Sequence, residues 1–589
     1  LYMEGVPLID DINETTASIT LDYQVSAQDD EGKTEIYDVT EFYRMRYTET
    51  RIMLLDFKRS ATKVFDPSQK VVSDAGLLLG VRDKNVTYAS DSSGKIVAFE
   101  QDGDLWSYAP SSGKITRIFS FRKEEDNDSR YVRNEHDIKI IRVADNVDFV
   151  LYGYMNRGVH EGYSGVCVYH YNSDRNVVEE KVFIPSTESY EFLKEDLGTL
   201  TYVNKNNQLF LLFAQKLYQV DIETGTSQVL EEGIKQNHFV VSDTKAHAAW
   251  LIESGDDAGK IREIEFDSLK TRDISPESGK NLRALGFMNE DLVYGILSDE
   301  DILTDANGHE TEGISTFRIE SFKGKVKKEY RQDGLYITNV TVGSTMMEFE
   351  LSAKSGNAYT VQKKDNIMNN KKASGSQIDV ALITTNRAGT LIRLTMTQKP
   401  ETDSPLLVCS KIESTEDSSV TLDTTVPQGE LYYVYAYGSL DRIYTDPAAA
   451  VKRADAQTGV VLNRAQQYVW ERGNKKTKLQ MNIEDVPESI RTANWKKKEL
   501  QDSLGDMGTV IDLTGCTLDN VLYEVSAQRP VIAKTGENSS VVIVGYDEYN
   551  TYLYDPATGQ ISPYGMNDST ALFESAGNVF LTYIENVIE

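Results

Sequence analysis

Cys516 is the residue in the C-terminal part of this chain that could act as a nucleophile. It stands directly before a predicted helix start at Thr517, and the N-terminus of a helix favours the ionised form of a thiol. A nucleophilic cysteine also needs a base, which is usually a histidine. The sequence has six histidines, and none follows His309. The C-terminal part therefore contains a candidate thiol without a candidate base.

Four short segments around and after this cysteine occur in a specific order. They read Gly-Cys-Thr-Leu-Asp (515–519), Arg-Pro-Val-Ile-Ala (529–533), Val-Val-Ile-Val-Gly-Tyr-Asp (541–547) and Asp-Pro-Ala-Thr-Gly (555–559). In this order and spacing they resemble the C39-like peptidases, which have a papain-type fold. The resemblance implies a cysteine nucleophile on an early helix, a histidine on the long strand, and an aspartate or asparagine on the next strand.

Two of these three catalytic positions are not filled as the family requires. Asp555 occupies the position of the orienting residue, Ser539 occupies the histidine position, and no cysteine occupies the nucleophile position. The resemblance therefore predicts a degenerate site, at Ser539 and Asp555, with no catalytic residues. We also expect Asp555 to form a turn, because Pro556 and Gly559 follow it.

Cys516 leaves one alternative open, which is a cysteine peptidase with an atypical site. In that case Cys516 would be the nucleophile, or the active groups would come partly from the N-terminal part of the chain. Cys516 lies downstream of the family's nucleophile position and next to a helix N-cap, so we favour a packing or capping role for it.

The first 400 residues are a succession of short apolar strands separated by polar turns. A strand, a polar turn and a second strand recur with turns near residues 60, 113, 174, 225, 269 and 324. A period of about 50 residues with about four strands in each unit is typical of a β-propeller. We predict an all-β propeller of 7–8 blades, with the strand at 18–25 closing the ring in the last blade; two β-sandwiches in tandem are the alternative.

The composition changes after this strand-rich part. Residues 413–429 are rich in Ser, Thr, Glu and Asp around Pro427, which is typical of a linker. Beyond it we predict helices starting near residues 446 and 517, and strands at 531–534, 541–546, 551–554 and 579–584. The predicted domains are a propeller (1–412), a linker (413–429) and an α+β domain of papain-like, C39-like type (430–589).

A loop in the predicted propeller is the best candidate for a binding surface. Residues 152–163 combine aromatic, basic and glycine residues between two strands, and such loops commonly carry binding residues. We select Tyr154, Arg157, His160 and Tyr163 as its contact residues. A packed loop without a ligand is the alternative.

Composition limits the classes of partner. With 62 basic and 92 acidic residues the net charge is −30, which disfavours nucleic acids and anionic membranes. The three cysteines include no CxxC pair, so we expect neither a disulfide framework nor a metal site, and no cofactor. No segment has the roughly 18 apolar residues that a membrane span needs.

The chain opens at Leu1 rather than at methionine, from which we expect an exported, extracellular or cell-surface protein whose leader or anchor precedes this residue. The predicted function is that of a non-catalytic binding or scaffold protein, in which propeller loops and a pseudo-peptidase domain engage a protein, a peptide or a cell-wall ligand. A sensor or assembly ectodomain with a membrane anchor is a further alternative.

Overall fold

The computed structural model describes residues 6–28, 32–80, 86–122, 130, 134–235, 238–253, 255, 259–304, 310–343, 346–356, 358–369, 378–385, 389–396, 398–414, 418–423 and 430–586. The chain is mostly β, with 54% of residues in strands and 12% in helices. It divides into two compact units. The first contains residues 23–39 and 61–427, and the second contains residues 6–22, 40–60 and 428–589. None of the helices in the described ranges is long and apolar enough to cross a membrane.

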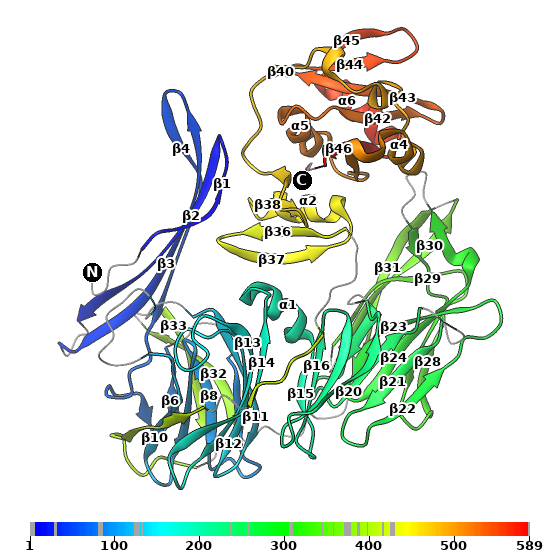
Figure 1. Ribbon diagram of the computed structural model, residues 1–589. Coiled ribbons are helices and arrows are strands. Elements are labelled where there is room, and N and C mark those ends of the chain that lie inside the picture. Colours follow the sequence, from blue (N-terminus) through cyan, green and yellow to red (C-terminus); the bar gives the residue numbers. More distant parts are fainter. Residues whose placement is uncertain are drawn as a thin grey trace. The chain divides into compact units, whose positions relative to one another are not determined.

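The first unit is built from small sheets that follow one another along the chain (Figure 1). The described ranges contain seven such sheets of three to five strands each. Neighbouring strands are antiparallel, with two parallel additions at sheet edges. Neighbouring sheets pack together through apolar side chains, as when Phe119 of the first sheet contacts Phe149 of the second with ring centroids 5.7 Å apart.

The strands of these sheets have the following bounds. The first two sheets contain β7 (Tyr88–Ser90), β8 (Val97–Gln101), β9 (Asp104–Ala109) and β10 (Lys114–Phe119), then β11 (His136–Val143), β12 (Val147–Tyr154), β13 (Ser164–Asn172) and β14 (Val177–Ser186). The next two contain β15 (Thr201–Val203), β16 (Gln208–Phe213), β17 (Lys216–Asp221) and β18 (Ser227–Glu232), then β19 (Phe239–Val241), β20 (His247–Leu251), β21 (Ile261–Glu265) and β22 (Lys270–Ile274). The last three contain β23 (Asn281–Met288), β24 (Asp291–Leu297), β27 (Thr316–Glu320) and β28 (Val326–Tyr330), then β29 (Tyr336–Val342), β30 (Met346–Ser355) and β31 (Ala358–Met368), and finally β32 (Ile378–Thr385), β33 (Gly389–Met396), β6 (Gly76–Leu78) and β5 (Val72–Ser73). Helix α1 (Tyr190–Thr199) precedes β15, and β25 (Ile302–Thr304) pairs with β26 (Glu310–Glu312).

Five of the six predicted hairpins are confirmed, from β9–β10 to β27–β28. The prediction around residues 59–60 is wrong, because β4 (Arg51–Lys63) runs through this position as one strand. The last sheet does join early and late parts of the chain, since β6 pairs with β33. The strand predicted for this closure was wrong: residues 18–25 lie in β2 (Thr16–Gln28), which pairs with β1 (Leu8–Ile12) and β3 (Thr34–Thr48).

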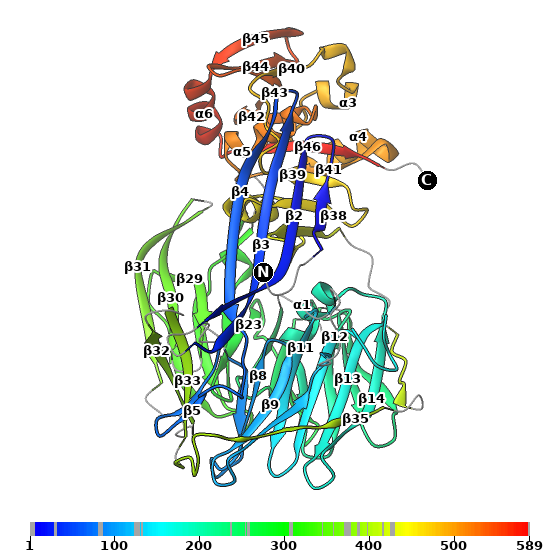
Figure 2. The ribbon, with the colours of Figure 1, turned by 90° about the vertical axis from the view of Figure 1, so that its left-hand side faces the viewer.

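Residues 406–423 form a segment that we call the strap. Its strand β34 (Leu406–Cys409) pairs in parallel with β10, and β35 (Lys411–Glu413) pairs in parallel with β14. Figure 2 shows this yellow-green segment crossing the edges of neighbouring sheets. Farther along, Val420 and Leu422 are buried against the third sheet. The described part of the predicted linker is therefore packed on the first unit, while residues 415–417 and 424–429 lie outside the described ranges.

Residues 430–586 of the second unit contain two sheets and five α-helices. The smaller sheet has the order β37 (Ser439–Tyr444), β36 (Tyr432–Ala436), β38 (Val460–Asn463) and β39 (Tyr468–Glu471). The larger has the order β41 (Gly508–Asp512), β46 (Phe580–Glu585), β42 (Val531–Gly536), β43 (Ser539–Tyr546), β44 (Asn550–Asp555) and β45 (Gln560–Gly565), with β40 (Leu479–Gln480) also on β43. The helices are α2 (Pro447–Ala456), α3 (Glu488–Arg491), α4 (Lys497–Leu504), α5 (Leu518–Ser526) and α6 (Met566–Ser575).

Local signals explain the two predicted helices. The Asp446 side chain accepts a hydrogen bond from the amide of Ala448, and Pro447 occupies the first turn of α2. Thr517 and Asn520 form a reciprocal capping box at the start of α5. Both predicted helix starts are therefore confirmed.

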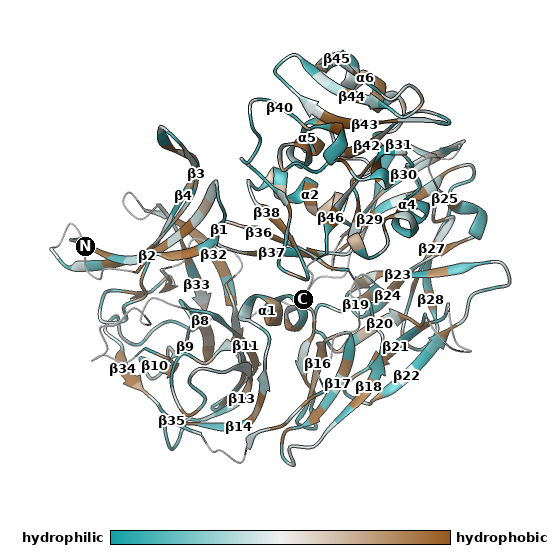
Figure 3. Cartoon of the chain, turned by 45° about the horizontal axis from the view of Figure 1, so that its top comes forward, coloured by the Kyte–Doolittle hydropathy of each residue, from teal (hydrophilic) through white to brown (hydrophobic). Residues whose placement is uncertain are grey.

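The larger sheet is covered on both faces, which explains the continuous apolar run in β43, drawn in brown in Figure 3. Val531 and Ile543 enter a core shared with α5. The alternate residues Ile532 and Val542 enter a second core with Leu500 of α4.

Two early segments, residues 6–22 and 40–60, belong to the second unit, and we call them the arm. Arg46 donates hydrogen bonds to the carbonyl oxygens of Gly473 (3.2 Å) and Lys475 (2.8 Å). Asn13 donates to both carboxylate oxygens of Glu471 at 2.8 Å. The range 1–412, which we predicted to be the propeller, therefore contains two segments that belong to the second unit.

Candidate functional site

Cys516 lies inside the core of the second unit rather than in a cleft. Its side chain is fully buried among apolar residues that include Leu513 and Val521. The thiol donates a weak hydrogen bond to the carbonyl oxygen of Ala448, with an S–O distance of 3.7 Å. Burial raises the pKa of Cys516 to about 12, so that the thiolate is almost absent near neutral pH.

Ser539, at the predicted histidine position, is exposed at the first residue of β43. It accepts a hydrogen bond from the hydroxyl of Thr535 at 3.0 Å and pairs with Gly536 across the β42–β43 hairpin. A serine hydroxyl cannot exchange a proton near neutral pH as an imidazole does. This position therefore supplies a turn contact and no base.

Asp555 forms a turn at the end of β44, as predicted. Its carboxylate accepts hydrogen bonds from the amide of Ala557 (2.9 Å) and the hydroxyl of Thr558 (3.1 Å). Its carbonyl oxygen accepts from the amide of Gly559 at 2.8 Å. Both carboxylate oxygens are thus occupied by the local turn, and no hydrogen bond joins Asp555 to Ser539 among the described residues.

A pocket of about 520 Å³ lies elsewhere in the second unit. Its lining includes Lys475, Lys476, Leu518, Tyr546 and Met566. Its lining includes none of Cys516, Ser539 and Asp555. This pocket is therefore not a peptidase site made of a cysteine, a base and an orienting acid.

The predicted binding loop follows β12 in the first unit. Tyr154 ends β12 opposite Ser164, and Tyr163 is 58% exposed. His160 stacks on Phe183 with ring centroids 3.7 Å apart. Arg157 is buried, so that the four selected side chains do not form one continuous surface.

Two of the four, Arg157 and His160, line a cavity of this unit with a volume of about 1060 Å³. Its walls come from the end of β10, the β12–β13 loop, β13, β14 and the strap. The strap contributes Cys409, Ser410, Ile412, Glu413 and Ser414. The strap therefore helps to enclose a cavity that the sequence did not indicate.

Glu180, like Arg157, is a buried charged residue in the lining of this cavity. Its side chain has no exposed surface. Its Oε1 accepts hydrogen bonds from His160 Nε2 (2.7 Å) and from the hydroxyl of Ser418 (2.5 Å). Its Oε2 is buried and has no hydrogen-bond partner within the described ranges. Only the sequence neighbourhood Val178-Glu179-Glu180, an acidic pair inside an apolar strand, could have indicated it.

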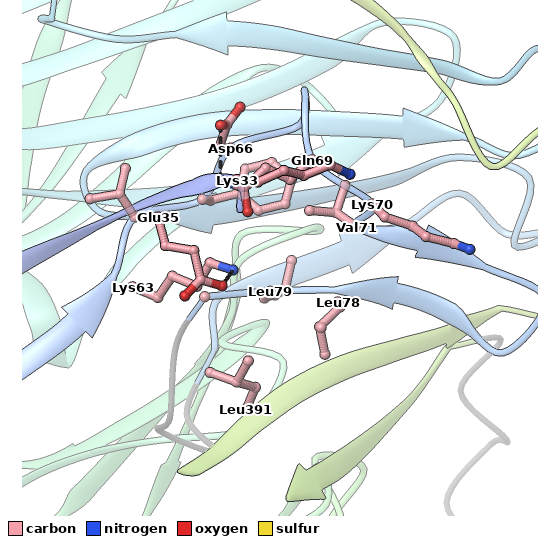
Figure 4. A pocket seen from close by; sticks show the side chains of 13 residues that line it. Lys33, Glu35, Lys63, Asp66, Gln69, Lys70, Val71, Leu78, Leu79 and Leu391 are labelled. Carbon is pink, nitrogen blue, oxygen red and sulfur yellow. Dashed lines mark hydrogen bonds and ion pairs between the residues drawn. The ribbon is translucent and has the colours of Figure 1, made fainter. Parts of the chain in front are cut away.

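A second pocket of the first unit is much smaller. It has a volume of about 160 Å³ and lies between the base of β4, β6 and Leu391. Figure 4 shows the ion pair between Lys63 and Glu35 inside it, where the nitrogen and oxygen atoms are 2.7 Å apart. Ligand pockets usually exceed roughly 300 Å³, so this small pocket is a poor candidate for a ligand site.

Comparison with known proteins gives weak structural similarities. No family model and no curated protein matches the chain. A C39-like peptidase from Bacillus anthracis is 18% identical over 16% of this chain and 58% of its own, with a TM-score of 0.14. A chain of the mitotic checkpoint complex is 9% identical over 56% of this chain and 97% of its own, with a TM-score of 0.26. A eukaryotic initiation factor is 11% identical over 59% of this chain and 92% of its own, with a TM-score of 0.25.

These structural neighbours include a C39-like peptidase and proteins with propellers, in line with part of the resemblance inferred from the sequence. The chain spans 58% of the length of the C39-like peptidase that it matches. Because these similarities are weak, the geometry of the candidate site has to indicate the function.

Proposed function

We propose that this protein is a non-catalytic binding or scaffold protein. The burial of Cys516 is the observation that carries the proposal, because its pKa is raised to about 12 and its thiol is held by the carbonyl oxygen of Ala448. The second unit contains no histidine, since all six lie between His136 and His309. A papain-type mechanism needs a thiolate beside an imidazolium, and neither group is provided.

In this proposal the first unit is a seven-bladed β-propeller and the second unit is a C39-like, papain-type domain without its chemistry. The seven successive sheets and the pairing of β6 with β33 support the propeller. The helix α5 followed by β42, β43 and β44 supports the C39-like order. The proposed partner is a protein, a peptide or a cell-wall ligand, and the proposed location is the cell surface or the extracellular space.

The proposed ligand site is the cavity under the β12–β13 loop. It is the place where predicted binding residues, Arg157 and His160, converge with a buried carboxylate, Glu180. Concave sites with apolar walls and a few placed polar groups are the usual form of ligand sites. Tyr163, which is exposed at the end of the loop, is available to a partner bound over it.

The alternative of a cysteine peptidase can be tested directly. The protein, its Cys516→Ala variant and its Cys409→Ala variant are incubated with a library of quenched fluorescent peptides. We expect no turnover above that of buffer from any of the three. Turnover that is lost in Cys516→Ala and kept in Cys409→Ala, together with specific alkylation of Cys516, would overturn the non-catalytic proposal.

A further inference from the structure

The outermost strands of the sheets in the first unit differ in how their edges are protected. Strands β18, β22 and β28 end their sheets with mostly exposed side chains, many of them charged, and such side chains hinder pairing with a further strand. Strands β10 and β14 are largely buried instead. The strap covers these two through β34 and β35. It therefore protects two edges that their own side chains do not protect.

The first half of the strap, residues 406–413, is held mainly through its backbone. For example, the amide of Lys411 donates to the carbonyl oxygen of Asn176 at 3.1 Å. Within this range, which the structure describes in full, no side chain is buried. Glu413 forms an ion pair with Arg175 at 3.2 Å, but the two side chains are 56% and 55% exposed. An ion pair exposed to this extent contributes little stability.

A segment held in this way opens at a low cost in free energy. Ordering the backbone of one residue costs about as much free energy as one backbone hydrogen bond returns, so a stable segment also needs buried apolar side chains. Parallel pairing is slightly less stable than antiparallel pairing. The second half of the strap differs, because Val420 and Leu422 are buried in a core with the β15–β18 sheet. We therefore expect residues 406–413 to open locally while residues 418–423 stay attached.

We propose that the outer edges of β10 and β14 form a β-addition site, which residues 406–413 cover and from which an extended segment of a partner protein displaces them. Addition of a strand to a sheet edge is a common mode of peptide recognition. A folded partner gains where the strap does not, because it can bury aliphatic side chains at positions where the strap leaves Leu406 66% and Ile412 42% exposed.

The strap itself indicates the chemistry of the segment that fits. It runs parallel to both β10 and β14. Residues 406–408 are aliphatic, and Glu413 places a carboxylate beside Arg175. The partner segment should therefore be extended and parallel to these strands, with aliphatic residues first and an acidic residue at its end. This inference goes beyond the ligand proposed for the cavity and does not depend on it.

The test is fluorescence anisotropy with a labelled peptide, Pro-Leu-Leu-Val-Ser-Ser-Lys-Ile-Glu, which copies residues 405–413 with serine in place of Cys409. It is titrated with the whole protein and with two variants. Lys411→Pro removes the amide that donates to Asn176 and so loosens the strap. Lys411→Ala is the matched control, because it removes the same exposed side chain and keeps the amide.

The strap competes with the peptide at a high effective concentration, so loosening it should expose the site. We expect Lys411→Pro to bind the peptide at least about tenfold more tightly than Lys411→Ala and the unmodified protein do. A peptide of the same composition in scrambled order should bind to none of them. Equal affinities of Lys411→Pro and Lys411→Ala, or no binding of the peptide by Lys411→Pro, would overturn the proposal.

A disulfide lock assigns the binding to the edge of β10. Arg117 and Cys409 are partners in the register of β10 and β34, so Arg117→Cys, made in the Lys411→Pro protein, places a second thiol opposite Cys409. We expect oxidation to abolish peptide binding and reduction to restore it. The control carries Cys409→Ser in addition and cannot form the bond, so the oxidant should not change its affinity. Binding that persists in the locked protein would contradict the assignment to this edge.

Sedimentation velocity separates a partner protein from a second copy of this chain. We expect Lys411→Pro and Lys411→Ala to sediment alike. Dimers of Lys411→Pro that the peptide dissociates would show that the strap of a second copy takes the site, and would overturn the assignment to a partner protein. If the lock does not form, the comparison of the two Lys411 variants still decides the inference. Failure of the peptide to bind leaves the non-catalytic proposal to the protease assay, which does not involve the strap.

Discussion

Arg44 and Glu471 form a buried ion pair, with Nη2 and Oε1 3.1 Å apart, although 427 residues separate them in the sequence. Arg44 also donates to the hydroxyl of Ser18 (2.7 Å) and through Nε to the carbonyl oxygen of Arg472 (3.1 Å). Asp11 lies 3.3 Å from the same guanidinium group. These contacts bind the arm to the end of β39, in the smaller sheet of the second unit.

Removal of one partner of this pair should destabilise the second unit strongly. We expect Glu471→Ala to lower the free energy of unfolding by about 3–5 kcal/mol, because Arg44 is left as a buried charge with less compensation. Urea unfolding followed by tryptophan fluorescence, to which the buried Trp470 of this unit contributes, measures the effect.

The control for this prediction is Lys496→Ala. Lys496 is also paired, with Glu499, but the two side chains are 59% and 56% exposed, so we expect a change below about 1 kcal/mol. The double variant Arg44→Met with Glu471→Leu should be more stable than Glu471→Ala alone, because it leaves no unpaired charge. Equal losses of unfolding free energy in Lys496→Ala and Glu471→Ala would show that the burial of the Arg44–Glu471 pair does not matter for stability.

Local sequence signals predicted the elements of the fold better than their pairing. Asp446 with Pro447 marked a helix start, and Thr517 marked another, because capping depends on residues a few positions apart. The pairing of Arg44 with Glu471 gives no such signal, since neither residue differs locally from an ordinary surface charge. For the same reason the closing strand was assigned to residues 18–25 instead of β6.

The candidate site was predicted only in part, for a related reason. The composition of the β12–β13 loop indicated Arg157 and His160. Glu180 and the strap come from distant positions, and their approach depends on parallel pairing of β35 with β14. That the C-terminal part contains no histidine, by contrast, could be read from the sequence without any geometry.

The strap should contribute to the stability of the first unit, although its sequence is typical of a linker. Leu422 is buried with Val420 against the third sheet, so we expect Leu422→Ala to cost about 2–4 kcal/mol. Leu406→Ala is the control, because Leu406 is 66% exposed. Thermal unfolding measures both, and limited proteolysis should cut the strap faster in Leu422→Ala only. A strap that acts as a free linker would give the same result for both variants.

The three cysteines should differ sharply in reactivity. Cys409 is exposed, whereas Cys167 and Cys516 are buried, and burial raises the pKa of both buried thiols. We expect one thiol per chain to react rapidly with a disulfide reagent in the native protein, and three in denaturant. The rapid reaction should disappear in Cys409→Ser. A rapid phase that persists in this variant would indicate that a second thiol is accessible.

His136 should make the first unit sensitive to acid. Burial lowers its pKa to about 4 from an ordinary value of 6.5, and its Nε2 lies 2.7 Å from the carbonyl oxygen of Gly103. Between pH 6.5 and pH 4 the unfolded chain therefore binds a proton that the folded unit does not. The contribution of the neutral His136 to the free energy of unfolding is fully present above pH 6.5. It decreases as the pH falls, by about 3 kcal/mol at pH 4.

Other groups also change the stability in this pH range. Burial raises the pKa of Asp102 to about 7, so protonation of its carboxyl stabilises the folded unit as the pH falls, which is the opposite effect. Comparing the protein with His136→Gln cancels such contributions and isolates that of His136. The difference in unfolding free energy between the two proteins should change with pH between 6.5 and 4 and be constant above pH 7. A difference that is independent of pH would mean that His136 titrates normally in the folded state.

Restoring a histidine at position 539 should not restore catalysis. Ser539→His places an imidazole at the exposed start of β43, but Cys516 remains inside the core with its thiol on the carbonyl oxygen of Ala448. An imidazole can activate only a thiol within hydrogen-bond reach. We expect no turnover of the peptide library by Ser539→His, and an unchanged slow alkylation rate of Cys516. Alkylation of Cys516 that becomes faster and depends on the ionisation of the new histidine would mean that the core opens to this strand, and the site would then have to be regarded as a dormant peptidase.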